Sequence, residues 1–385
     1  MLFRKLVIMQ AGVYIHLPIC KSRCIYCDFF SQTNAGLENE IVDLILREID
    51  LAALKYPDFN AQTQYLGGGT PSCFSDSNIK KLLQAIRSNF TSSGDDLKEI
   101  TVEMNPDDVD LDKLNSYREM GINRISLGVQ SFDDRALRFL SRRHNSKQNL
   151  SAINLLQKAG FTNYSIDLIF AVPGQADSEF FQSLETAIEL EPAHISLYCL
   201  SSEPGTELSR MLDSGIICAL SEENQAVMFR EAIIRLKSAG FRQYELSNFA
   251  LPGHECQHNL IYWNMQEYLG FGPSAHSFYH GSRWGNYPDL NKYFEIVKSS
   301  NLPHPPEEKL SAQRWAEELL MLSLRLDEGL NLNEYHRITG HSLLDGKKEI
   351  IEDLVKNGLA EIKSGSMCLT IEGLLVADEI LVKLL

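Results

Sequence analysis

The chain has 385 residues, 44% of them hydrophobic, and a formal net charge of −15 at pH 7. This length suits one large α/β domain with a smaller appendage, or two ordinary domains. The negative charge argues against loose binding to nucleic acid or to anionic membranes. No apolar run approaches the roughly 20 residues that span a bilayer. The opening residues 1–12 carry an apolar patch that is too short for a secretory signal, so we expect a cytoplasmic protein.

Short β-rich runs alternate with longer amphipathic stretches over about the first 200 residues. Gly160 and Gly240 follow two of the helical stretches, at a position that favours a left-handed residue. Six βα repeats indicate a parallel sheet with helices outside, but the periodicity leaves open whether the sheet closes into a barrel. The predicted strands are residues 13–17, 63–67, 100–104, 124–129, 164–170 and 194–200, and the clearest helices are 38–55, 78–90 and 148–161.

Three of the eight cysteines crowd into the stretch CKSRCIYCDFF, on the loop predicted to leave the first strand. Structural zinc normally takes four protein ligands, and the one nearby candidate, His16, lies within the strand. A disulfide with a spare thiol does not suit a reducing compartment. A cubane iron–sulfur cluster suits three thiolates and leaves one iron open to an outside amine and carboxylate. The spacing of Cys20, Cys24 and Cys27, with Tyr26 before the last, resembles the radical S-adenosylmethionine (SAM) signature.

Glycine-rich or polar residues follow several of the other predicted strands. The turn YLGGGTPS lets the backbone approach a ligand closely and offers N–H groups to it. Carboxylates can bind ribose hydroxyls or an amino group, and an arginine can pair with a carboxylate. Any one of these residues could instead be a satisfied polar residue at a barrel rim. Because active sites of β/α barrels collect at the C-terminal strand ends, we expect a convergent site there. Its members are residues 67–70, Glu103, Gln130, Arg142 and Asp167.

Seven motifs occur in order across about residues 11–290 and resemble the oxygen-independent coproporphyrinogen III oxidase family of radical-SAM proteins. They are YIHLPICKSRCIYCDF, GGGTPS, VEMNP, LGVQSF, DLIFAVPGQ, YELSNFA and HNLIYW. The resemblance implies an α/β fold built on a partial (β/α)6 barrel. It assigns Cys20, Cys24 and Cys27 to a [4Fe–4S] cluster. One departure is Ser141, where the family often has glycine. By motif matching, the residues implied for SAM are Tyr14, Tyr26, Gly68, Gly69, Thr70, Glu103, Gln130, Arg142 and Asp167.

The family has two branches with different functions. The oxidase decarboxylates coproporphyrinogen III with a 5′-deoxyadenosyl radical, whereas the heme chaperone HemW binds heme and passes it to acceptor proteins. Phe29 stands where the oxidase has another cysteine, and only 19 residues precede Cys20, fewer than in the oxidase. We therefore expect a heme chaperone that also needs an electron donor, with the oxidase as the alternative and another radical reaction as a third hypothesis. The sequence leaves open whether SAM is cleaved during function.

The stretch HECQHNLIYWN resembles the H-N-x-x-Y-W heme motif of the chaperone branch. His254, Cys256 and His258 are potential axial ligands of heme iron. The alternative is a loop that closes the barrel and whose histidines bond to backbone. We expect His258 to ligate the iron, with His276 as a further candidate for the same cavity. The residues expected to contact heme are His258, Asn259, Tyr262 and Trp263.

The pattern changes after about residue 300. The proline-rich residues 301–310 are predicted to link a barrel domain, residues 1–300, to a C-terminal domain, residues 311–385. The barrel domain includes the heme-motif extension at about 240–290. Residues 311–385 hold 8 Lys/Arg against 13 Asp/Glu, a balance of −5, whereas DNA binding needs clustered cations. We expect a packing or lid domain of winged-helix-like form. Its predicted elements are helices near 311–325, 331–338 and 343–357, a hairpin over 358–370 and a final helix.

Overall fold

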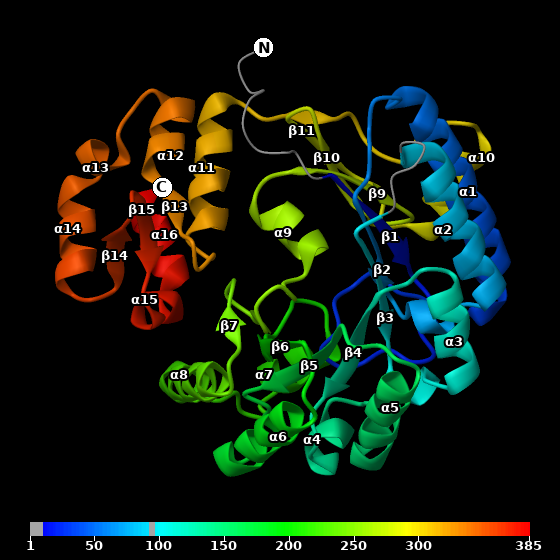
Figure 1. The fold of residues 1–385 in the computed structure, drawn as a ribbon, viewed down its shortest axis with the longest axis horizontal. Coiled ribbons are helices and arrows are strands. Elements are labelled where there is room, and N and C mark those ends of the chain that lie inside the picture. The colour runs from blue at the N-terminus through cyan, green and yellow to red at the C-terminus, as the bar shows by residue number, and fades with distance from the viewer. Residues whose placement is uncertain (1–10, 92–96) are drawn as a thin grey trace.

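The computed structural model describes residues 11–91 and 97–385, so most of the predicted opening segment lies outside the described residues. One curved sheet carries helices on its outer face, and a smaller domain lies beside it (Figure 1). The six predicted strands form neighbouring parallel strands of this sheet, which confirms the expected α/β architecture. They are β1 (Ala11–Leu17), β2 (Thr63–Gly68), β3 (Glu99–Met104), β4 (Arg124–Gln130), β5 (Tyr164–Phe170) and β6 (His194–Cys199).

Short strands that the sequence did not predict extend the sheet at both edges. β9 pairs with β1 in parallel, and β10, β11 and β12 follow it in antiparallel order. β8 and β7 continue the sheet beyond β6. β7 and β12 stand at opposite ends of the strand order, so the sheet is a partial barrel. The added strands are β7 (Arg242–Gln243), β8 (Asn248–Ala250), β9 (Glu267–Phe271), β10 (His276–Tyr279), β11 (Ser282–Gly285) and β12 (Glu308–Lys309), the last within the predicted linker.

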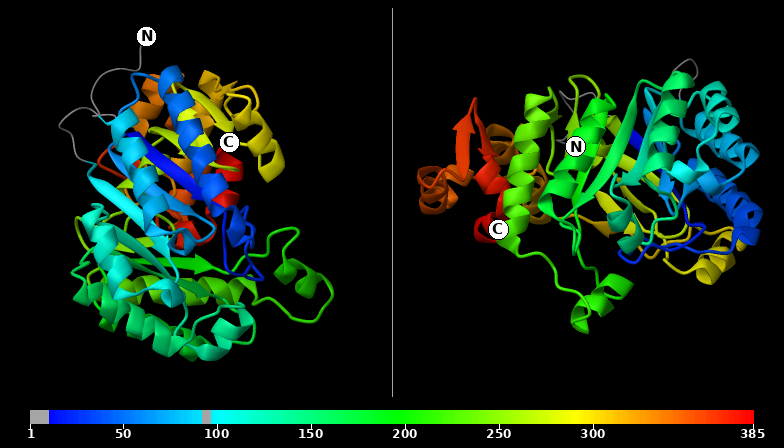
Figure 2. Two further views of the ribbon diagram at one scale, coloured as in Figure 1. Left: turned by 90° about the vertical axis from the view of Figure 1, so that its right-hand side faces the viewer. Right: turned by 90° about the horizontal axis from the view of Figure 1, so that it is seen from below.

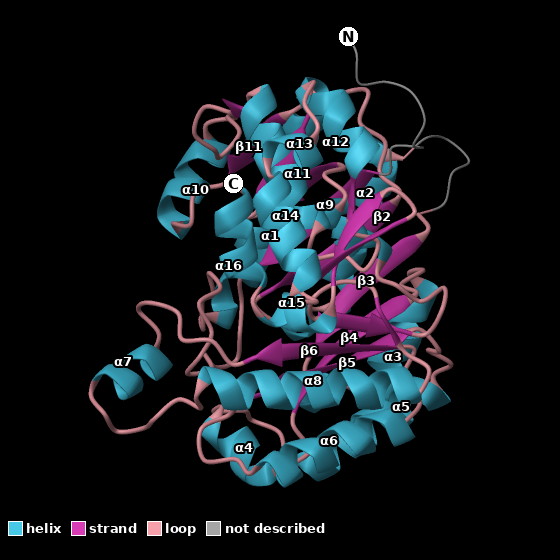
Figure 3. Cartoon of the chain, turned by 90° about the vertical axis from the view of Figure 1, so that its left-hand side faces the viewer, coloured by secondary structure: helices cyan, strands magenta, loops and turns pink. Residues whose placement is uncertain are grey.

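Amphipathic helices cover the outer face of the sheet. In α1, for example, Ile41, Ile45 and Ile49 are fully buried along one stripe, as the helical repeat requires. Gly160 and Gly240 have the predicted left-handed conformation, with φ of 79° and 92°. α7 projects away from the barrel (Figure 3). The helices of this part of the chain are α1 (Glu38–Lys55), α2 (Asp76–Phe90), α3 (Leu111–Glu119), α4 (Asp134–Phe139), α5 (Ser146–Lys158), α6 (Asp177–Glu189), α7 (Glu207–Asp213) and α8 (Glu222–Ser238).

Two further helices belong to the barrel domain. α9 (Gln257–Trp263) packs on β1, β2 and β9, on the concave side of the sheet. α10 (Leu290–Lys298) packs against α1. Within the described ranges, no helix combines the length and the apolar character that crossing a bilayer requires.

The C-terminal domain has its own hydrophobic core and lies at one side of the barrel (Figure 2). Glu318 accepts two hydrogen bonds from Arg283 of the barrel, and Glu372 accepts two from Arg230. The predicted helix 343–357 is divided at Lys347. The elements are α11 (Ala312–Ser323), β13 (Leu330–Asn331), α12 (Leu332–Thr339), α13 (Leu343–Gly346), α14 (Lys348–Lys356), β14 (Ala360–Lys363), β15 (Ser366–Leu369), α15 (Ile371–Leu375) and α16 (Ala377–Leu384).

Candidate functional site at the mouth of the barrel

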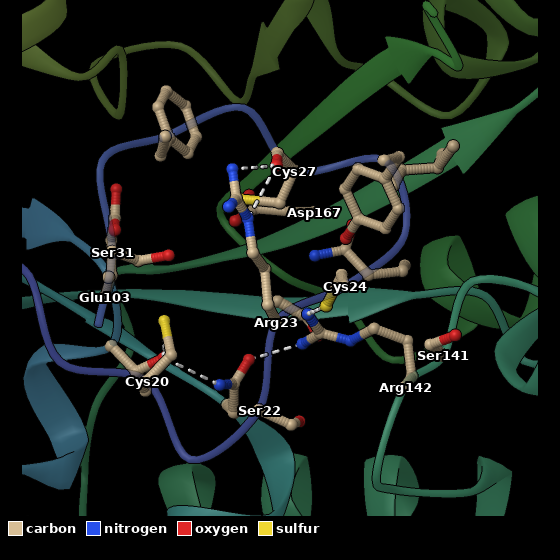
Figure 4. A pocket seen from close by; sticks show the side chains of 18 of the residues that line it. Cys20, Ser22, Arg23, Cys24, Cys27, Ser31, Glu103, Ser141, Arg142 and Asp167 are labelled. Atoms are coloured by element: carbon tan, nitrogen blue, oxygen red, sulfur yellow. Dashed lines mark hydrogen bonds between the residues drawn. The ribbon is translucent and has the colours of Figure 1, made fainter. Parts of the chain in front are cut away.

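A cavity of about 440 Å³ opens at the C-terminal ends of the parallel strands (Figure 4). Its size is in the range of cofactor sites. The structure brings the three cysteines together here with all but one of the residues predicted for SAM. Those that line the cavity are Cys20, Cys24, Tyr26, Cys27, Gly68, Gly69, Thr70, Glu103, Gln130, Arg142 and Asp167.

The cysteine loop leaves β1 and is fixed at two points by backbone hydrogen bonds. Near its start, the Cys20 N–H donates to the Gln32 carbonyl over 2.8 Å. Further along, the Ile25 carbonyl accepts from the Leu208 N–H of α7 over 2.9 Å. The loop therefore has a defined course, and its three thiols are free.

A chain of hydrogen bonds connects two of the thiols across the cavity. The Thr70 hydroxyl donates to Cys20 Sγ over 3.4 Å, and the Asn105 amide donates to the Thr70 hydroxyl over 3.3 Å. Arg142 donates to the Asn105 side-chain oxygen Oδ1 and, over 3.4 Å, to Cys24 Sγ (Figure 4). The arrangement places a guanidinium and a hydroxyl against sulfur atoms that must become thiolates to bind iron.

The donor set fits an iron–sulfur cluster. Burial raises the pKa of the Cys20 and Cys27 thiols, partly offset for Cys20 by the Thr70 hydrogen bond. Among the described residues, no group of three or more His, Cys, Asp or Glu side chains is arranged to hold one metal ion. A cubane differs from a single ion because its cysteines bind separate iron atoms. Three free thiols on one loop are the ligands such a cluster takes.

Three N–H groups of the glycine turn after β2 bond within the protein. Gly68 donates to Glu103, Gly69 to the Leu17 carbonyl and Thr70 to the Ile19 carbonyl. The glycines allow a close approach to the cysteine loop. A Cβ on Gly69 would lie 2.7 Å from the Leu17 oxygen and 2.8 Å from the Ile19 oxygen. The turn therefore supports the loop through backbone contacts.

Two half-buried carboxylates lie on neighbouring parts of the cavity wall. Glu103 accepts from the Tyr65 hydroxyl over 2.9 Å and from the Gly68 N–H over 3.2 Å. Burial raises the pKa of Glu103 to about 7, and the charge of Asp167 adds to the shift. Asp167 accepts from two serine hydroxyls, and burial raises its pKa as well. Both carboxylates can accept hydrogen bonds from a ribose or an ammonium group.

Two cavity residues have left-handed backbone conformations. Gln130 has φ of 66°, at a register shift between β4 and β5, and Ser141 has φ of 57°. Such strain is common at binding sites. The Ser141 angle would suit glycine, which adopts this conformation without strain, and nothing in the structure explains the serine.

Tyr14 is the exception among the residues predicted for SAM. It lines a second cavity, of about 180 Å³, inside the barrel. The two cavities share Ser126 and Tyr198 as lining residues. The second cavity also contains the buried guanidinium of Arg124, whose Nε has no hydrogen-bond partner. Tyr14 therefore lies deeper in the barrel than the other predicted residues.

The predicted heme motif closes the barrel floor. Glu99 of β3 accepts the Gln257 and His258 N–H groups, each over 3.0 Å, and so fixes the start of α9. His258 is 1% exposed; its Nδ1 lies 2.7 Å from the Thr63 hydroxyl and its Nε2 lies 2.8 Å from the Tyr262 hydroxyl. Both nitrogens are used within the protein. Ligation of heme iron by His258 would have to break one of these bonds.

The other predicted heme residues do not form one surface. Asn259 and Tyr262 line the second cavity with His258, whereas the Trp263 Nε1 is buried without a hydrogen-bond partner. Cys256 is buried and its thiol lies 3.4 Å from Glu99. His276 lines neither of the two cavities and is exposed on β10.

Sequence reasoning missed three residues that shape the site. Asn105 bridges Thr70 and Arg142, although it belongs to the quoted motif VEMNP. The Ser126 hydroxyl donates to Asp167 over 2.8 Å. Tyr198, at the end of β6, lines both cavities. The strand-end rule applied to β6 would have found Tyr198.

The comparisons with known proteins agree with this geometry. The model of the Radical SAM superfamily matches residues 14–187, and the model of the HemN C-terminal domain matches residues 310–376. The heme chaperone HemW of Bacillus subtilis is 33% identical, covering 96% of this chain and 97% of its own length. The heme chaperone HemW of Synechocystis is 36% identical, covering 84% and 80%.

Similarity extends to a vertebrate protein and to a solved structure. The mitochondrial radical S-adenosyl methionine domain-containing protein 1 of Danio rerio is 31% identical over 97% of this chain and 86% of its own. Coproporphyrinogen III oxidase (HemN) of Escherichia coli shares the fold, with a TM-score of 0.83, 22% identity and coverage of 98% and 90%. Membership of the radical SAM superfamily implies SAM and a [4Fe–4S] cluster. The chain belongs to the HemW branch of the HemN-like radical SAM proteins.

Proposed function

We propose that this protein is a heme chaperone that carries a [4Fe–4S] cluster on Cys20, Cys24 and Cys27, holds SAM in the cavity at the barrel mouth, and delivers heme to acceptor proteins. The observation that carries the proposal is the gathering of three free thiols with polar residues from four strand ends in one cavity. When bound, such a cluster anchors the amino and carboxylate groups of SAM at its open iron and can supply the electron for cleavage.

The residues of the cavity have roles suited to SAM. Arg142 presents a guanidinium whose Nε has no partner, and it can pair with the carboxylate of a ligand. Glu103 and Asp167 can accept hydrogen bonds from the ribose or the amino group. Tyr26 packs beside a small apolar cluster at the same rim and offers a ring face. Gly68, Gly69 and Thr70 keep the cysteine loop in place.

Heme delivery is supported by the curated relatives, which are named heme chaperones. It requires an acceptor protein and an electron donor. We propose the cytoplasm as the compartment because all eight cysteines are free. The net charge of −15 supports the proposal that nucleic acid is not a partner.

The alternative, decarboxylation of coproporphyrinogen III, is less well supported. Phe29 occupies the position where the oxidase pattern has a cysteine, and its side chain is 63% exposed at the cavity. The likeness to HemN rests on the fold. The relatives that share a third of the sequence are chaperones by name.

One experiment separates the two functions. The full chain is reconstituted anaerobically with iron and sulfide, then incubated with heme or, separately, with coproporphyrinogen III, SAM and a reductant. We expect heme to remain with the protein through gel filtration and coproporphyrinogen III to be recovered unchanged. Formation of protoporphyrinogen, or loss of heme from cluster-loaded protein, contradicts the proposal.

A further inference from the structure

The extra strands β9, β10 and β11 present one face to the inside of the barrel. Tyr268 of β9 pairs with Gly12 of β1, and a Cβ on Gly12 would touch the His258 ring at 2.9 Å. Phe278 of β10 pairs with Tyr268. Paired residues point to the same side of a sheet, and so do residues two apart in a strand. His276, two residues before Phe278, therefore also belongs to the concave face.

Aromatic side chains cover this face at Tyr268 and Phe278. The Tyr262 ring of α9 packs on Tyr268 at 4.6 Å, and the Trp315 ring of the C-terminal domain packs on Phe278 at 5.4 Å. His276 lies beyond both contacts and is exposed. Because β9 runs parallel to β1 and β10 runs back along it, the start of β10 lies at the barrel mouth. His276 thus stands two strands, or about 10 Å, from β1.

The imidazole of His276 lies against Gly285 of the neighbouring strand. A Cβ on the facing Gly285 would lie 2.8 Å from its Cε1, 3.0 Å from Nδ1 and 3.2 Å from Nε2. The ring therefore lies flat over a glycine whose missing side chain makes room for it. Within the part of the chain that the structure describes, neither ring nitrogen makes a hydrogen bond. Burial and the nearby Arg283 lower the pKa of His276, which favours the neutral imidazole that binds metals.

We propose that heme binds at the mouth of the barrel on the concave face of β10 and β11, with His276 as the axial ligand of its iron. The proposal rests on the heme chaperone function and names its ligand. The two histidines differ in availability. His258 is buried and both of its ring nitrogens are hydrogen-bonded, whereas His276 is exposed and neither of its ring nitrogens is hydrogen-bonded. The heme then lies on the same side of the molecule as the cysteine loop.

The test uses full-length, cluster-loaded protein and heme. In His276→Gly we expect the Soret band to shift and heme affinity to fall by about tenfold or more, since loss of even a supporting partner costs a metal site this much. Imidazole added in solution should restore the wild-type spectrum by filling the vacated space. His280→Gly, an exposed histidine on the same hairpin, is the matched control and should bind heme normally.

A second variant tests position rather than identity. Gly285→Ala keeps His276 but places a methyl group against its ring, so we expect weaker heme binding. An unchanged spectrum and affinity in His276→Gly would overturn the assignment, and so would a changed spectrum that imidazole fails to restore. Failure of the wild-type protein to bind heme would instead remove the proposed function itself, so the two failures are distinguishable.

Discussion

Arg142 has the most connected position at the cavity. Its guanidinium donates to the Asn105 oxygen, to the Gly128 carbonyl over 2.9 Å and to Cys24 Sγ over 3.4 Å. These contacts fix a planar, permanently charged group beside the cysteine loop. A lysine cannot reproduce such a fork of donors.

Arg142→Lys therefore tests the binding role of this residue. We expect SAM affinity to fall about tenfold, equal to about 1.4 kcal/mol, because lysine lacks the Nε donor that is left to pair with the ligand carboxylate. Equilibrium dialysis of cluster-loaded protein measures it, with iron content as the control. Wild-type affinity in the variant would show that Arg142 serves the loop alone.

His258 shows what the sequence could not provide at this scale. The cysteine spacing is a local pattern and identifies its residues directly. The state of His258 depends on Thr63, which lies 195 residues away, and on the Glu99 carboxylate that fixes its helix. The motif alone left ligation and barrel closure open, and the fold places this histidine in the floor.

His258→Ala should accordingly behave as a structural change. Losing a buried ring and two hydrogen bonds should lower the free energy of unfolding by about 2–4 kcal/mol. Thr63→Val removes one partner and should cost about 1–2 kcal/mol. Denaturant titration measures both. Wild-type stability in His258→Ala would contradict the closing role.

At the scale of elements, the sequence predicted the six parallel strands well because each is a continuous buried run. The edge strands were missed because they are two to five residues long, too short to show a strand pattern in the sequence. β12 lies within a proline-rich stretch that was predicted as a linker. The division of helix 343–357 at Lys347 also left no signal in its apolar periodicity.

One buried carboxylate connects three of these elements. Glu48 of α1 is 2% exposed. It accepts from the Tyr293 hydroxyl of α10 over 2.6 Å, from the Gly272 N–H after β9 over 2.8 Å and from the Asn286 amide over 2.7 Å. Burial raises the pKa of Glu48 to about 7, although these hydrogen bonds lower it.

This shift predicts a pH-dependent stability. Between about pH 4.5 and 7 the folded state keeps the Glu48 proton that the unfolded chain has released, so stability falls as pH rises through this window, by about 3 kcal/mol. Glu48→Gln should reduce the slope of stability against pH. Part of the slope should remain, because the pKa of Glu103 is also raised to about 7.

Denaturant unfolding measured from pH 4.5 to 8 checks the Glu48 prediction. Glu40→Gln, on the same helix and paired at 2.6 Å with Lys298, is the control and should keep the wild-type slope. An identical slope in wild type and Glu48→Gln would contradict the assignment.

At the scale of the whole molecule, the cysteine loop, the cavity of about 440 Å³ and the exposed His276 lie at the same end of the barrel. The C-terminal domain joins the barrel through Arg283–Glu318 and Arg242–Asp327, the latter at 2.9 Å. The sequence indicated this domain but not its contacts, because they join residues that only the complete fold brings together. Its negative balance agrees with a packing role.

The most direct test of the account is the electron paramagnetic resonance spectrum of the reduced, anaerobically reconstituted protein, recorded with and without SAM. We predict a [4Fe–4S] signal that shifts when SAM is added, is absent in Cys24→Ala and is retained in the control Cys218→Ala. A signal that does not change when SAM is added would contradict the central claim that three cysteines hold a cluster with one iron open to SAM. Metal analysis that finds zinc in place of iron and sulfide would contradict it as well.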